Sequence, residues 1–222
     1  MTNWQHQIRA VAFDMDGLMV NTEDLYTIVG ETILQRRGSR FTPELKNRMM
    51  GLPGDAAWQV MIDSENLSDS TATLAAESDE IFERLLPTRL EMLPGLVELL
   101  DLLDQHQIPR CVATSSSHRF AKLVLTQIDV LKRMAFVVTA DDVANGKPAP
   151  DIYLEAAERM RVAAENMLVL EDSHNGSRAG VAAGACTIAV PGEHSADHDF
   201  SHVAAIANSL ADPLISSQLS NA

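Results

Sequence analysis

Two aspartates separated by one residue, Asp14 and Asp16, are the residues whose spacing first suggests chemistry. They follow the mainly apolar run 8–13, which is typical of a strand buried on both faces of a parallel sheet. Gly17 comes next and permits a tight turn. Two acids at a strand end suit a bound cation, with one acid left to react. Because Asp and Gly are also common in ordinary polar turns, both interpretations stay open on this stretch alone.

Further polar groups stand where other predicted strands end or helices begin. They are Thr114, Ser115, Ser116, Lys147, Glu171 and Asp172. Ligands bind beyond the carboxyl ends of the strands in an open parallel sheet, so we expect these groups to converge with Asp14. Taken singly, each has an ordinary explanation as a turn residue, a helix cap or a solvated lysine. Taken together, they favour one site with carboxylates, hydroxyls and an amine.

The pattern of the chain predicts an α/β fold with a doubly wound parallel sheet. The predicted strands are residues 8–13, 108–113, 135–138, 167–170 and 186–190, with helical patterns between the later ones. Residues 22–86 show only helical patterns. We therefore expect an α/β core from residues 1–19 and 92–222, with an all-helical domain, residues 20–91, inserted after the first strand. One helix should start at Pro94, and the last helix of the insertion should end at Pro87.

Composition narrows the classes of function. The 222-residue chain is 46% hydrophobic, which excludes a disordered protein, and no apolar run is long enough to span a bilayer. Its formal net charge of −14 repels nucleic acid and anionic membranes, so neither is an expected partner. An anionic substrate would need a local cation. Cys111 and Cys186 lie in apolar runs and should be reduced thiols. We therefore expect a cytoplasmic protein. We also expect a monomer.

Four motifs in order along the chain resemble those of the haloacid-dehalogenase superfamily. They are Asp14-x-Asp16-Gly17, Thr114-Ser115, Lys147-Pro148 and Glu171-Asp172. The helical insertion resembles the small cap of that superfamily. The residues around the motifs are similar to the branch that contains β-phosphoglucomutases and small-metabolite phosphatases. The resemblance covers nearly the whole chain, and four motifs in register make it specific.

The resemblance implies a role for each motif residue. Asp14 would be the nucleophile that forms an aspartyl-phosphate, and Asp16 would be the general acid and base. The implied phosphate-binding residues are Thr114, Ser115 and Lys147. The implied Mg²⁺ ligands are Asp14, Asp16 through its backbone carbonyl, Asp172, and Glu171 through a bound water. The substrate would be a small phosphorylated metabolite.

The residues expected to face the substrate, partly from the cap, are Glu23, Tyr26, Gly51, Gly54, Ser116 and His118. β-Phosphoglucomutases carry a His where Tyr26 stands, an Arg near Gly54 and a Lys near Glu77 or Ser78. A mutase needs cap cations for the distal phosphate of a bisphosphate, and this cap turn offers none. We therefore favour a phosphatase. A mutase stays the alternative, with Arg48 or Arg84 as substitute cations.

Other interpretations are weaker. A receiver domain combines similar residues but has no helical insertion, and a non-catalytic relative would be expected to lose one of the four motifs. His194, His198 and His202 recur at every fourth residue, as in a metal site on a helix. Because they lie in a polar segment without a helical pattern, we assign no metal site to them.

Overall fold

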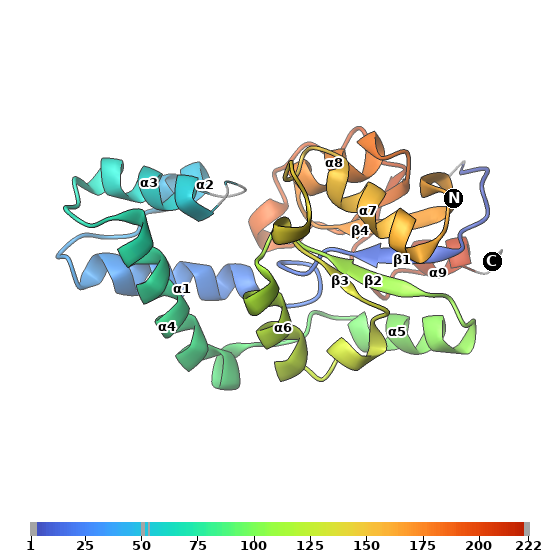
Figure 1. Ribbon diagram of the computed structural model, residues 1–222, viewed down its shortest axis with the longest axis horizontal. Coiled ribbons are helices and arrows are strands. Elements are labelled where there is room, and N and C mark those ends of the chain that lie inside the picture. Colours follow the sequence, from blue (N-terminus) through green and yellow to red (C-terminus); the bar gives the residue numbers. More distant parts are fainter. Residues whose placement is uncertain (1–3, 50–51, 53, 220–222) are drawn as a thin grey trace. The chain divides into compact units, whose positions relative to one another are not determined.

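The computed structural model describes residues 4–49, 52 and 54–219, and the chain forms two compact units (Figure 1). We call the first the core, which contains Met1–Asn21 and Glu91–Ala222. The second is the cap, Thr22–Leu90. Each unit is described by itself below.

The core is built on one six-stranded sheet with the order β3-β2-β1-β4-β5-β6, and all neighbouring strands are parallel. Its strands are β1 Ala10–Phe13, β2 Arg110–Ala113, β3 Val137–Val138, β4 Met167–Glu171, β5 Cys186–Ala189 and β6 Ala205–Ile206. The strand order reverses direction between β1 and β4, which is the place where open α/β sheets bind ligands. The predicted doubly wound parallel sheet is confirmed.

Helices cover both faces of the sheet. Helices α7 (Asp151–Met160) and α8 (His174–Ala182) lie on one face, and α5 (Leu96–Gln105) and α6 (His118–Gln127) lie on the other (Figure 1). Helix α9 (Pro213–Leu219) also belongs to the core, and neither it nor β6 was predicted. Small side chains such as Ala10 and Ala12 of β1 are fully buried against the first helical layer. Small residues let α7 and α8 pack close to the strand ends.

Two helix boundaries differ from those expected. Helix α5 begins at Leu96 rather than Pro94. Gly95 has φ 89°, a left-handed conformation that does not occur inside a right-handed helix, so the helix can begin only after it. Helix α4 (Thr71–Arg89) runs through Pro87 and ends two residues later. A proline in the last turn removes only one backbone hydrogen bond, and the remaining turn tolerates that loss.

The described residues of the cap form four helices. They are α1 (Thr22–Gln35), α2 (Pro43–Met49), α3 (Gly54–Glu65) and α4. Leu25, Val29 and Ile33 recur on one face of α1 and are buried, which fits the helical pattern of this region. Arg37 joins two further parts of the cap, because its guanidinium contacts Asp69 at 2.8 Å and Glu77 at 2.7 Å. The cap therefore has an apolar centre closed by an ion-pair network.

The two ends of the insertion meet within the core. The backbone N–H of Asn21 donates to Glu91 O at 3.1 Å, and Leu93 N–H donates to Met19 O at 2.9 Å. The side-chain carbonyl of Asn21 also accepts from Glu91 N–H at 2.8 Å. Val20 and Met92 form an antiparallel bridge between these bonds. The chain thus leaves the core and returns to it through one short ladder.

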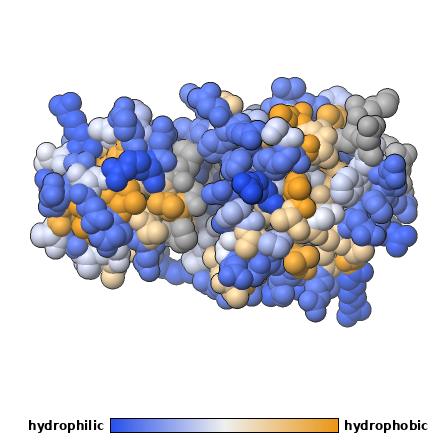
Figure 2. All heavy atoms as spheres, turned by 90° about the horizontal axis from the view of Figure 1, so that it is seen from above, coloured by the Kyte–Doolittle hydropathy of each residue, from blue (hydrophilic) through white to orange (hydrophobic). Residues whose placement is uncertain are grey.

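The surface is mostly polar, and apolar residues gather only in small groups on the face seen in Figure 2. The exposed large apolar side chains are spread over many elements: Leu52, Met92, Val97, Leu123, Leu154, Val181 and Ile206. Among the described residues, no helix has the length and apolar character needed to cross a membrane.

Candidate active site

Asp14 lies directly beyond the carboxyl end of the central strand β1. Phe13 pairs with Val112 of β2 and with Leu170 of β4, so the three strand ends are level. The backbone N–H of Asp14 donates to Leu170 O at 3.0 Å, which continues the sheet by one residue. The Asp14 residue is only 6% exposed. The sheet thus holds this carboxyl group in a fixed and nearly dry position.

Lys147 approaches Asp14 from the loop before α7. Its ammonium forms ion pairs with the carboxylates of Asp14 and Glu171, the latter at 2.6 Å, and donates to Ala113 O at 3.0 Å. The Lys147 side chain is 6% exposed, and the Glu171 side chain is completely buried. The peptide bond between Lys147 and Pro148 is cis. A buried cation therefore lies between two buried carboxylates, where water screens the charges weakly.

Burial and charge act in opposite directions on the ionisable groups here. Burial raises the pKa of Asp14 well above its usual range, although the charge of Lys147 opposes the shift. Burial also disfavours the charged form of Lys147, but the carboxylates of Asp14 and Glu171 outweigh it and raise the pKa of the amine. Lys147 is thus a permanent cation that favours the ionised, nucleophilic form of Asp14.

Both carboxylate oxygens of Glu171 accept hydrogen bonds. Oε1 accepts from Lys147 at 2.6 Å and from the Tyr153 hydroxyl at 2.8 Å. Oε2 accepts from the N–H and the hydroxyl of Ser173, at 3.1 and 2.9 Å. The start of α8 packs directly on this carboxylate, and a Cβ at Gly176 would overlap it. Glu171 is therefore held rigidly, and it in turn fixes the position of Lys147.

Asp16 contacts a pair of hydroxyl groups at the end of β2. Its Oδ2 accepts from Thr114 Oγ1 at 3.1 Å and from Ser116 Oγ at 2.8 Å. Ser116 N–H donates to Thr114 Oγ1 at 3.0 Å, so the two residues form one turn. Asp16 is more exposed than Asp14. One acid is thus buried beside a lysine, and the other lies nearer to solvent beside hydroxyls, which suits different chemical roles.

Three of the carboxylates could hold a metal ion. One oxygen from each of Asp14, Glu171 and Asp172 lies within 4.8 Å of the other two, and all three residues are buried. These three carboxylates carry more negative charge than Lys147 offsets, so a bound divalent cation would balance the charge of the site. Oxygen ligands are those that Mg²⁺ prefers, and the residues present therefore fit this ion.

The remaining core residues predicted for the site lie in different places. Ser115 follows Thr114 and is exposed. His118 begins α6 and does not contact Asp14 or Asp16; its ring lies 3.2 Å from Thr139 Oγ1 and 3.3 Å from Asp142 Oδ2. His118 is thus fixed to the turn after β3.

The predicted cap residues lie within the cap. Glu23 is in the first turn of α1, Gly54 begins α3, and Gly51 lies outside the described residues. The ring of Tyr26 meets Phe82 edge to face, with centroids 4.5 Å apart.

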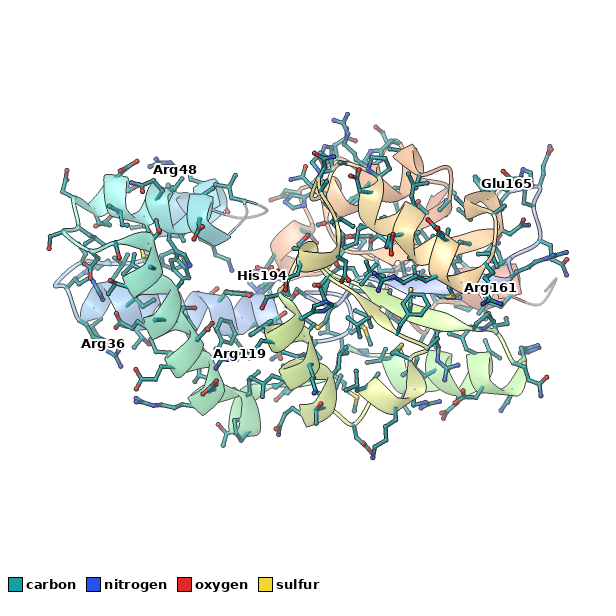
Figure 3. The ribbon with its side chains drawn as sticks, in the orientation of Figure 1. Arg36, Arg48, Arg119, Arg161, Glu165 and His194 are labelled. Carbon is teal, nitrogen blue, oxygen red and sulfur yellow. The ribbon has the colours of Figure 1, made fainter. Side chains whose placement is uncertain are left out.

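The basic residues of the cap are mostly paired. Glu77 forms ion pairs with Arg36 at 2.6 Å and with Arg37. Arg84 pairs with Glu80. Arg36 and Arg48 lie on opposite sides of the cap in Figure 3, and among the described residues Arg48 forms no ion pair. Arg48 is therefore a candidate for binding a ligand.

Tyr153 is a site residue that sequence reasoning missed. Its hydroxyl donates to Glu171, and its ring lies 5.2 Å from the Lys147 ammonium. It is fully buried, and burial raises the pKa of its phenol well above the usual value. The signal was available in part: Tyr153 follows Lys147 by six residues, at the start of a helix whose buried face includes Ile152.

We expect Tyr153→Phe to reduce kcat by about tenfold while KM changes little, because the loss acts through the position of Lys147. The ring contact with Lys147 remains in this variant, and only the hydrogen bond to Glu171 is removed. A lost hydrogen bond to a charged group should lower the free energy of unfolding by about 2 kcal/mol. Steady-state kinetics and urea unfolding measure both effects. An unchanged kcat would show that Lys147 is held without Tyr153.

Comparison with known proteins identifies the family of this chain. A family model described as haloacid dehalogenase-like hydrolase matches residues 11–190. The chain is 33% identical to a phosphorylated carbohydrates phosphatase of Thermotoga maritima, covering 80% of this chain and 82% of the relative. It is 36% identical to (DL)-glycerol-3-phosphatase 2 of Arabidopsis thaliana, covering 86% and 82%.

A solved structure shows the same fold. CbbY from Rhodobacter sphaeroides, in complex with phosphate, superimposes with a TM-score of 0.81 at 24% identity, covering 92% of this chain and 96% of that one. The family model and the relatives together show the family and the activity of this chain, which carries the buried Asp14 and Lys147. The chain belongs to the haloacid dehalogenase-like hydrolases and is a phosphatase, a hydrolase of phosphoric monoesters.

Proposed function

We propose that this phosphatase acts through an aspartyl-phosphate formed on Asp14 and that it requires Mg²⁺. The observation that carries the proposal is the position of Asp14, which is buried at the centre of the sheet edge and paired with Lys147. A carboxylate fixed in this way can attack phosphorus without competition from bulk water.

The proposed reaction has two steps. An oxygen of Asp14 attacks the phosphorus, the ester P–O bond breaks, and Asp16 gives its proton to the leaving alcohol oxygen. Asp16 then takes a proton from a water that attacks the aspartyl-phosphate, which releases inorganic phosphate and restores Asp14. Lys147 and the hydroxyl of Thr114 lie close enough to these acids to hold phosphoryl oxygens.

Asp14 and Asp172, with the backbone carbonyl of Asp16, would hold the Mg²⁺ directly, and Glu171 would act through a bound water. When bound, Mg²⁺ supplies positive charge that offsets the repulsion between a carboxylate nucleophile and a phosphate dianion. Glu171 already accepts four hydrogen bonds, so it serves the site mainly by fixing Lys147.

We expect phosphate release from a panel of small phosphate esters to require a divalent cation. Excess chelator should remove activity, and Mg²⁺ should restore it, because the carboxylate cluster is otherwise left with uncompensated charge. The panel should include sugar phosphates, glycerol 3-phosphate and nucleotides. We propose sugar and polyol phosphates as the best substrates, since the named relatives act on such compounds. Full activity in excess chelator would contradict the metal assignment.

We expect no useful mutase activity. β-Glucose 1-phosphate with a catalytic amount of the 1,6-bisphosphate should give free phosphate or no reaction, not glucose 6-phosphate. The resemblance puts the cap lysine of a mutase near Glu77 or Ser78, and Glu77 is here an acid paired with two arginines. A coupled glucose 6-phosphate assay measures the outcome. Efficient formation of glucose 6-phosphate that is lost in Arg48→Ala would establish the alternative, a mutase whose distal phosphate is held by Arg48.

The proposal includes a monomer in a reducing compartment such as the cytoplasm. Cys111 and Cys186 are both free and buried, and burial raises the pKa of the Cys186 thiol to about 12, so both are protected thiols. Sedimentation analysis of the purified protein tests the oligomeric state.

A further inference from the structure

A second group of ligand-type side chains lies in the core, formed by His174, Asp199 and His202. His174 begins α8, whereas the other two belong to the segment between β5 and β6. One ligand atom from each side chain lies within 4.8 Å of the other two. The two imidazole rings meet edge to face, with centroids 5.3 Å apart. Residues 196–204 form turns, not an α-helix, so this group does not follow the every-fourth-residue histidine pattern.

Hydrogen bonds fix the protonated nitrogen of each imidazole. His174 Nδ1 lies 2.6 Å from the backbone carbonyl oxygen of Asp199, which can only accept, so Nδ1 carries the proton. His202 Nε2 lies 2.9 Å from Ser177 Oγ. The Ser177 hydroxyl already donates its hydrogen to His174 O at 3.0 Å, so it accepts from His202 and Nε2 carries the proton.

This arrangement leaves a lone pair on the opposite nitrogen of each ring, Nε2 of His174 and Nδ1 of His202. Histidines that bind metals are usually oriented in this way, with the second nitrogen donating to a carbonyl or another acceptor. In Asp199, Oδ1 accepts from the backbone N–H of Ser201 at 2.9 Å, which orients the carboxylate as well. Both imidazoles are therefore held with one nitrogen unprotonated, and the Asp199 carboxylate is held in one orientation, as metal ligands need.

We propose that His174, Asp199 and His202 form a binding site for a divalent transition-metal ion, with zinc as the best candidate. Two imidazoles and one carboxylate are a common zinc ligand set, and open positions remain for water. Mg²⁺ prefers oxygen ligands and should bind here poorly. In the tetrahedral geometry of zinc, with bonds of about 2.1 Å, two ligand atoms lie about 3.4 Å apart. Ligand atoms at the 4.8 Å limit would approach each other by about 1.4 Å to close the site.

The site would tie two segments of the core together. Helix α8 follows Glu171 and Asp172 directly, so a metal on His174 would join the end of β4 to the segment before β6. Because the ion binds the folded chain and not the unfolded one, zinc should raise the midpoint of thermal unfolding. This effect does not depend on phosphatase activity.

Zinc titration of the whole protein against a chromogenic indicator, in excess Mg²⁺, tests the proposal. The wild type should bind one tight equivalent, and Asp14→Asn should retain it. His202→Ala and Asp199→Asn should each weaken binding at least tenfold and lose the zinc-dependent rise in the unfolding midpoint. His106→Ala is the matched control, because His106 is exposed at the end of α5 and should bind zinc like the wild type.

Co²⁺ supplies an independent signal, since its visible absorption reports imidazole coordination and should disappear in His202→Ala. Asp199→Asn preserves the shape of the side chain and keeps the test decisive if His202→Ala folds poorly. Absence of tight zinc binding in excess Mg²⁺ would overturn the proposal. Equal affinity in both variants and the control would also overturn it, because the zinc would then lie elsewhere.

Discussion

Asp14→Asn should abolish phosphatase turnover, with a loss in kcat on the order of 10⁶, because the amide cannot attack phosphorus. The fold should survive. Asp14, Glu171 and Asp172 are three buried acids near a single lysine, so removing one negative charge leaves Lys147 paired with Glu171. We therefore expect the unfolding midpoint in urea to be unchanged or higher.

Phosphate release and urea unfolding, measured on the same preparation, separate chemistry from folding. Asp129→Asn is the control, because Asp129 has an 87% exposed side chain and should keep full activity. Substantial turnover by Asp14→Asn would mean that water attacks the phosphorus directly, and the aspartyl-phosphate would then be the wrong intermediate.

Lys147→Met should cost both activity and stability. The ammonium is the shared partner of two buried carboxylates, and removal of one side of a buried ion pair lowers the free energy of unfolding by about 3–5 kcal/mol. Activity should be lost as well, because Asp14 would lose the cation that favours its ionised form. Urea unfolding and phosphate release measure the two effects. Lys132→Met is the matched control, with a side chain that is 88% exposed, and should leave both unchanged.

The stability of Lys147→Met should also depend on pH with a definite sign. Carboxyl groups that are buried without a counter-ion have raised pKa values, so the folded state binds protons that the unfolded state releases. The stability of the variant should thus recover as the pH falls and decline as it rises. Addition of Asp14→Asn to Lys147→Met should restore part of the lost free energy at neutral pH. Additive effects would show that the two side chains do not interact.

The convergence of Asp14, Lys147, Glu171 and Asp172 could be anticipated from the sequence because it depends on local signals. Each residue follows an apolar run or precedes a helical pattern, and a parallel sheet brings its carboxyl strand ends to one edge. The sheet itself was predictable for the same reason. Strand β6 was not predicted because a two-residue strand carries almost no pattern, and the short helix α9 was not predicted either.

Contacts that depend on side-chain direction could not be anticipated. Sequence patterns did not single out Tyr153, because only the packing of α7 on the sheet decides that its hydroxyl meets Glu171. The same holds for the histidines. The lack of a helical pattern argued against a helical metal site on His194, His198 and His202, but the sequence did not indicate that turns bring His202 to His174 of another element.

The ladder that joins Asn21 to Glu91 makes the cap an exchangeable module. The core itself holds the two ends of the insertion at hydrogen-bond distance, so the ends stay adjacent whatever sequence lies between them. Insertions whose ends are close together disturb a host fold little. Evolution could therefore replace residues 22–90 by another helical unit, or by a short turn, without redesigning the phosphate chemistry. Grafting caps from relatives at this junction is accordingly a direct route to new substrate preferences on one catalytic core.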